Sequence, residues 1–171
     1  IFECNLNWVV GILSPASQYL CAILELLRSL DPEAKRIALF SAKTGFATDM
    51  ASGALAWIRR EGYTLAIHQS YRSGFEDFRS LLNPLKDDPP DWFLGVGQVE
   101  DDIRLGRQLC EVRPRLKAAG LVVAAISRFK ADLGERTDGF FAPSQWEPQV
   151  EYNVDCGPSE NAFLTHYLKG A

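Results

Sequence analysis

The stretch Trp8-Val9-Val10-Gly11-Ile12-Leu13-Ser14-Pro15-Ala16-Ser17-Gln18-Tyr19-Leu20 decides the fold, because an apolar strand leads through a short polar loop into a helix. We expect Ser14 to cap this helix and Pro15 to lie in its first turn. The apolar stripe of the helix comprises Leu20, Ile23, Leu24, Leu27 and Leu30. A strand followed by such a loop is typical of parallel sheets, whose ligand pockets form at the carboxyl ends of the strands.

The alternation of strand and helix continues along the chain. Near-continuous apolar runs predict strands at residues 8–13, 36–40, 92–96 and 121–126, and an alternating run predicts a strand at 64–69. Helical spacing predicts helices at 47–61, 75–85 and 99–112, the second of them ended early by Pro84. This pattern predicts an α/β fold: a doubly wound parallel sheet with strand order 2-1-3-4-5 and helices on both faces.

Size and charge exclude several functional classes. The 171 residues suffice for one core, and the net charge of −4 with scattered Lys and Arg leaves no basic face for nucleic acid. No apolar run approaches the roughly 20 residues of a membrane-spanning helix and none follows a basic segment, so we expect the residues shown neither to span nor to target a membrane. Because the chain begins at Ile1 and its last predicted helix, 160–169, has nothing to pack against, we expect a piece of a longer protein.

The four cysteines, Cys4, Cys21, Cys110 and Cys156, lack the spacing of a metal site and are interpreted as small buried apolar residues. A bridge between Cys4 and Cys156 stays open for an exported protein. The two histidines also lack metal-ligand spacing. We therefore expect no metal and no cofactor.

Polar side chains follow the predicted strands at 14–18, 41–46, 98–101 and 127–130. In a parallel sheet these segments meet at one edge, where neutral donors and acceptors beside an apolar wall suit a small polar or zwitterionic ligand. The alternative is that the hydroxyl groups only cap helices, and that the acids at 100–102 only complement a helix dipole. The candidate ligand contacts are Ser14, Ser17, Gln18, Thr44, Phe46, Gln98, Asp101 and Ser127.

Catalytic and nucleotide-binding motifs are absent from the sequence. Gly95-Val96-Gly97 is followed by Glu100 where a dinucleotide loop needs its third glycine, and Ala42-Lys43-Thr44-Gly45 lacks the order of a phosphate-binding loop. No serine lies in a GxSxG elbow. A receiver-like or flavodoxin-like domain is disfavoured, because Ser14-Pro15 and Gln69-Ser70 stand where a receiver needs acids. None of these motifs therefore predicts a catalytic or nucleotide-binding site.

Several segments in series resemble the branched-chain amino acid (Leu/Ile/Val-binding) type of ABC-transporter substrate-binding proteins, which have the type I periplasmic binding fold. They include residues 13–20, Asp31-Pro32, Gly62-Tyr63-Thr64 and Ser144-Gln145-Trp146-Glu147-Pro148. Members of this family have two α/β lobes joined by three crossing segments, and this chain is similar to the second lobe. The resemblance implies a ligand-binding lobe at 1–142, and at 143–171 a crossing segment and the first helix of the return to a missing first lobe.

The resemblance also implies a function, that of a binding protein and not an enzyme. Such a protein is the substrate-binding component of an ABC importer for amino acids or related small polar solutes such as amides and carboxylates. It would lie in the periplasm or outside the cytoplasm, close its two lobes on the solute, and dock on a membrane permease. The alternative is a regulatory sensor lobe of the same fold. Phe46 falls where relatives often have a tyrosine, Gln98 where an aromatic residue is common, and Ser127 near an acid that pairs with the ligand ammonium, so an ordinary hydrophobic amino acid is doubtful as the solute.

Overall fold

Five parallel strands form one sheet in the computed structural model, which describes residues 13–147, 150 and 157–170. The strands are β1 (Arg36–Ala42), β2 (Thr64–Tyr71), β3 (Trp92–Val96), β4 (Ala118–Leu121) and β5 (Phe140–Phe141). Their order in the sheet is β2-β1-β3-β4-β5, and every neighbouring pair is parallel. The predicted fold class and the strand order 2-1-3-4-5 are therefore confirmed, although the numbering shifts by one: the strand expected as the second, at 36–40, is the first strand of the described sheet.

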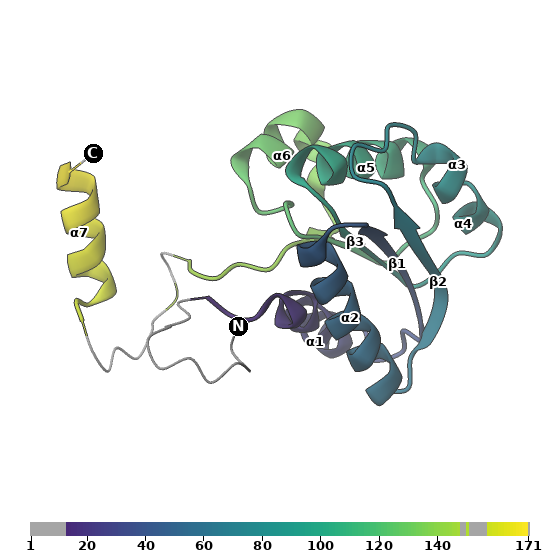
Figure 1. Cartoon of the computed structure of the whole chain (residues 1–171), viewed down its shortest axis with the longest axis horizontal. Helices are drawn as coiled ribbons and strands as arrows, with labels where there is room; N and C mark the ends of the chain where they lie inside the picture. The colour runs from purple at the N-terminus through teal and green to yellow at the C-terminus, as the bar shows by residue number, and fades with distance from the viewer. Residues whose placement is uncertain (1–12, 148–149, 151–156, 171) are drawn as a thin grey trace.

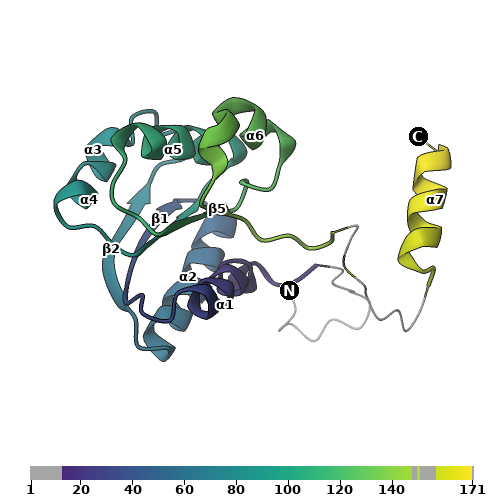
Figure 2. The same ribbon diagram turned by 180° about the vertical axis from the view of Figure 1, so that it is seen from behind.

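Helices cover both faces of the sheet (Figures 1 and 2). One face carries α1 (Tyr19–Leu30) and α2 (Gly45–Arg60), with the 3-10 helix η1 (Ala16–Gln18) against α2. The other face carries α3 (Arg79–Leu82), α4 (Pro84–Asp87), α5 (Val99–Val112) and α6 (Ser127–Leu133), and the 3-10 helix η2 (Gly134–Thr137) follows α6. The last helix, α7 (Glu160–Gly170), stands apart from the sheet in both views and buries none of its side chains.

The centre of the sheet supplies most of the core. Every residue of β3 is buried, as is every residue of β1 after Arg36, because helices cover both faces of these strands. In the edge strand β2 only Tyr71 is buried. The continuous and alternating apolar runs of the sequence thus correspond to central and edge strands, respectively.

Two of the predicted strands need correction. Residues 8–12 of the first lie outside the described residues, and Leu13 is 55% exposed and not in a strand. The run predicted at 121–126 extends only to Leu121, because β4 covers Ala118–Leu121 and residues 122–125 form a turn. The small residues of β4 carry little strand signal, yet they are needed: a Cβ on Gly120 would crowd the Leu94 and Ile23 side chains. The fifth strand, Phe140–Phe141, was not predicted.

The starts and ends of two helices also differ from expectation. Ser14 does not cap the first helix and Pro15 does not lie in its first turn, because η1 comes before α1: Pro15 is the N-cap of η1, and Gln18 is the N-cap of α1. Leu30 is 62% exposed, whereas the other four members of the predicted stripe are buried. The helix expected at 75–85 is divided into α3 and α4, because Pro84, which lacks an N–H, starts a new helical turn.

Candidate functional site

The carboxyl ends of the strands bring the predicted site segments to one edge of the sheet. Thr44 follows β1, Gln98 follows β3 and Ser127 follows the turn after β4. These three strands are neighbours, with Ser41 paired to Val96 and Gly95 to Leu121 near their carboxyl ends. The three loops therefore lie next to one another, and we call this side of the sheet the carboxyl edge.

The hydroxyl and amide side chains of this edge differ in whether they form hydrogen bonds within the protein. Thr44 caps α2, since its Oγ1 accepts from the Ala47 N–H at 3.3 Å, as the capping interpretation expects. Gln98 precedes α5 without a side-chain capping bond. The Gln98 and Ser127 side chains are exposed, and neither makes a hydrogen bond within the described part of the chain. They are free to bind a ligand.

An aromatic corner stands beside these loops. Phe46, in the first turn of α2, is 45% exposed and meets Tyr19 edge-on with ring centroids 5.8 Å apart. The η1 segment with Ser17 and Gln18 lies along α2 so closely that a Cβ on Gly53 would overlap the Ser17 carbonyl oxygen. Ser17 and Gln18, like Ser14, are exposed. The close packing at Gly53 thus fixes a polar segment next to an exposed aromatic ring.

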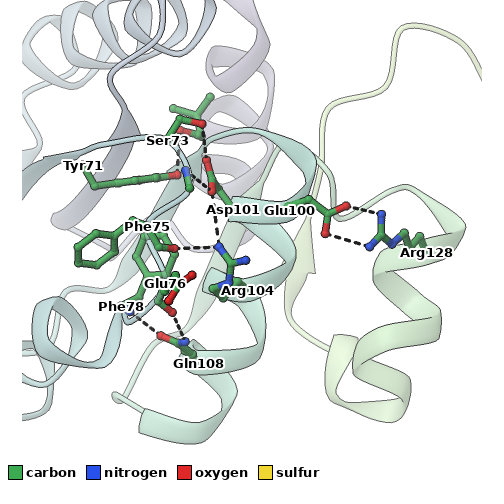
Figure 3. Close-up of polar contacts among 12 residues, drawn as sticks. Tyr71, Ser73, Phe75, Glu76, Phe78, Glu100, Asp101, Arg104, Gln108 and Arg128 are labelled. Atoms are coloured by element: carbon green, nitrogen blue, oxygen red, sulfur yellow. Dashed lines mark hydrogen bonds and ion pairs between the residues drawn. The ribbon is translucent and has the colours of Figure 1, made fainter.

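Asp101 points inward from α5, unlike the other candidate contacts. It is 1% exposed, and its carboxylate accepts from the Ser73 hydroxyl at 3.1 Å and the Gly74 N–H at 2.9 Å (Figure 3). Arg104 lies 3.8 Å from the same carboxylate. Asp101 therefore holds the loop after β2, and a direct contact with a ligand stays a prediction.

Two further polar side chains of α5 hold the same loop, and sequence reasoning missed both (Figure 3). Arg104 Nη1 donates to the Phe75 carbonyl at 2.9 Å. Gln108 donates to the Glu76 carbonyl at 2.8 Å and accepts from the Phe78 N–H at 2.5 Å. Positions 101, 104 and 108 share one helix face, so the polar spacing of three and four residues was the signal that could have found them. These two side chains supply hydrogen-bond partners for backbone groups of the loop that lie outside any helix or strand.

A second carboxylate is buried directly beneath the edge. Asp102 is fully buried, and burial, helped by the negative charge of Asp101, raises its pKa to about 7. Backbone N–H groups of Gly97 and the turn after β4 oppose this rise, but none makes a hydrogen bond of good geometry with the carboxylate. Burial and the two acids also raise the pKa of Tyr71. A Cβ on Gly97 would overlap the Tyr71 hydroxyl, so this packing requires glycine.

An ion pair joins the starts of α5 and α6 on the surface of the edge (Figure 3). Arg128 Nη1 and Nη2 donate to the two carboxylate oxygens of Glu100 at 2.5 and 2.9 Å. Both side chains are more than half exposed, so the pair contributes little stability. Because each of these two side chains neutralises the other, neither offers an unpaired charge to a ligand.

The described residues contain neither a metal-binding cluster nor a membrane-spanning helix. Within 13–147, 150 and 157–170 no three His, Cys, Asp or Glu side chains are grouped to hold a metal ion. No helix in this part of the chain is long and apolar enough to cross a membrane. Cys21 and Cys110 are half-buried free thiols, whereas Cys4 and Cys156 lie outside the described residues.

No family model matches the chain, but solved structures share its fold. The leucine-, isoleucine-, valine-, threonine- and alanine-binding protein of Brucella ovis in its closed conformation matches with a TM-score of 0.77 at 12% identity, over 92% of this chain and 39% of its own. The leucine-binding protein LivK of Thermotoga maritima matches with a TM-score of 0.72 at 17% identity, over 87% and 41%. The chain has the fold of one lobe of such proteins.

A Rhodopseudomonas palustris solute-binding protein of an ABC transporter, in complex with benzoate, also matches, with a TM-score of 0.62 at 12% identity. The match spans 71% of this chain and 33% of that protein. The neighbours are solute-binding proteins and not enzymes. The chain spans about two fifths of the length of the first two structures, which agrees with the expectation of a single lobe.

Proposed function

We propose that this chain is the second lobe of the substrate-binding component of an ABC importer, and that its carboxyl edge is one wall of the solute cleft. The observation that carries the proposal is the set of exposed, uncommitted polar side chains beside Phe46 on the edge where parallel α/β sheets bind ligands. Ligand binding would close this lobe against a first lobe by a hinge motion. Outside the cytoplasm, the closed protein would then dock on a membrane permease and deliver its solute.

A contact between the two ends of the lobe supports the hinge. The Ser14 N–H donates to Gln145 Oε1 although 131 residues separate them. In the proposed receptor Ser14 belongs to the lobe at 1–142, just after the strand that follows the first crossing, and Gln145 belongs to the second crossing, within 143–171. The bond therefore ties the second crossing to the start of the lobe, where a hinge between two lobes has to bend.

The charges of the edge favour amides and carboxylates among the solutes. Asp101 is buried and occupied by Ser73 and Gly74, and Glu100 is paired with Arg128. The two acids Glu100 and Asp101 are therefore not free to pair with an amino acid's ammonium group. An amino acid would need another partner for its ammonium, whereas Gln98 and Ser127 can donate directly to a carboxylate or amide oxygen.

The test uses the protein encoded by the full reading frame and calorimetry against a panel of amino acids, amides and aliphatic and aromatic carboxylates. Phe46→Ala is expected to weaken binding of the best solute by about tenfold or more, because it removes an exposed aromatic wall. Leu26→Ala is the matched control, since Leu26 is 47% exposed on α1 and has no place at the edge. Equal affinities of the two variants and the unmodified protein would contradict the proposal.

A further inference from the structure

A hollow lies at the amino-terminal edge of the sheet, opposite the carboxyl edge. Its volume is about 310 Å³, and it opens between the end of α5, the starts of β4 and β5, and η2. Leu109, Leu116 and Phe140 give it an apolar lining. Because the amino and carboxyl ends of parallel strands lie on opposite edges, this hollow is separate from the proposed solute cleft.

Two guanidinium groups share this hollow without carboxylate partners. Arg113 Nε donates to the Cys110 carbonyl at 3.2 Å, and Arg136 Nε donates to the Leu133 carbonyl at 3.3 Å. Each bond uses one N–H of a group that has five, and within the described residues neither arginine forms an ion pair. Lys117 also lines the hollow, but it is held by Asp31 and Asp91 at 3.0 and 3.3 Å. The free positive charge in the hollow is therefore that of the two arginines.

The Cys110 thiol lines the same hollow as both arginines. Burial and the charge of Glu111 raise the pKa of this thiol, and the charges of Arg136 and Arg113 act against that rise. The Sγ atom itself lies 3.5 Å from the Arg136 carbonyl oxygen. One acid, Asp138, lines the hollow as well and forms no ion pair in the described part of the chain. Two positive charges thus face one negative charge across a partly apolar surface.

The backbone of Arg113 is strained. Its φ of 52° and ψ of 54° are left-handed, and among the described residues it is the one non-glycine residue with a positive φ. Helices commonly end with glycine at such a position, because a side chain there is strained. Backbone strain of this kind is concentrated at functional sites, so it marks Arg113 as a candidate for one.

We propose that this hollow binds a small organic anion, a carboxylate or a phosphate ester. Its charged group would lie between Arg113 and Arg136, and its apolar part would lie on Leu109, Leu116 and Phe140. Arginine suits this role because its planar fork donates two parallel hydrogen bonds to a carboxylate or phosphate. The site is independent of the proposed solute cleft, since it shares no residue with it.

The test titrates the 171-residue chain with phenyl phosphate and, in a second arm, phenylacetate, and follows alkylation of Cys110 by iodoacetamide with peptide mass spectrometry. Both anions are expected to slow Cys110 alkylation and to leave Cys21 unaffected, and the stronger of the two identifies the headgroup. Benzyl alcohol, which has the ring without the charge, is expected to protect at least tenfold more weakly. Equal protection by benzyl alcohol, or no protection by either anion, would overturn the proposal.

A variant separates binding from folding. Arg113→Gly relieves the left-handed backbone, so it is expected to keep or raise the melting temperature while weakening anion protection about tenfold or more. Arg115→Gly removes the same charge two residues away, outside the hollow, and is expected to leave protection unchanged. If Arg113→Gly folds and still binds phenyl phosphate as tightly as the unmodified chain, the arginine pair is not a binding site.

Discussion

Replacing Asp102 with asparagine is expected to stabilise the chain at pH 8 and to have little effect near pH 4. Asp102 is fully buried, and its pKa is about 7 in place of the ordinary 3.8. The folded chain therefore holds a proton there that the unfolded chain releases between pH 4 and pH 7, so stability falls as pH rises through this window. A tenfold change in proton affinity is about 1.4 kcal/mol, and a difference of roughly three such steps gives up to about 4 kcal/mol.

The assay is urea unfolding at several pH values from 4 to 8, followed by the fluorescence of the buried Trp57 and Trp92. The free energy of unfolding of the Asp102→Asn variant minus that of the unmodified chain cancels the titration of all other groups. This difference is expected to rise from near zero at pH 4 to a plateau above pH 7. The exposed Asp49→Asn change is the control, with an effect below about 0.5 kcal/mol. A difference for Asp102→Asn that does not vary with pH, or that falls, would refute the reasoning.

Three other substitutions test the packing around the carboxyl edge. Gly53→Ala is expected to cost about 1–3 kcal/mol in urea unfolding, because the new Cβ overlaps the Ser17 carbonyl oxygen. Gly45→Ala, in the same helix with open space around it, is expected to be neutral or stabilising, and a similar loss in both variants would show that the overlap is not the cause. Asp101→Ala is expected to cost about 1–3 kcal/mol and to speed hydrogen exchange at the Gly74 N–H, whose partner it removes; unchanged exchange would contradict the loop-holding role.

The sequence predicted the strands that are both long and buried on two faces. The runs at 36–40 and 92–96 are long, apolar and covered on both faces, so they became β1 and β3. The run at 122–126 is just as apolar, yet it forms a turn: Val123 is buried there without being extended. The strand before it, Ala118–Leu121, is short and built of small residues because α1 packs close to Gly120. Apolar composition reports burial more reliably than it reports conformation.

The candidate site was predictable in position more than in detail. Parallel topology alone brings the segments after β1, β3 and β4 together, and Thr44, Gln98 and Ser127 lie where that rule puts them. The partners of Asp101 and the ion pair of Glu100 with Arg128 depend on tertiary distances that one sequence does not contain. Whether the exposed side chains contact a solute stays a prediction.

The affinity of this chain for a solute that the full-length protein binds tests the central claim most directly. If the carboxyl edge is one wall of a two-lobed cleft, the isolated chain lacks about half of the contacts. A loss of about 4 kcal/mol would turn a micromolar site into one near millimolar. Calorimetry is therefore expected to give micromolar binding for the full-length protein and millimolar or undetectable binding for the 171-residue chain. Micromolar binding by the chain alone would contradict the account.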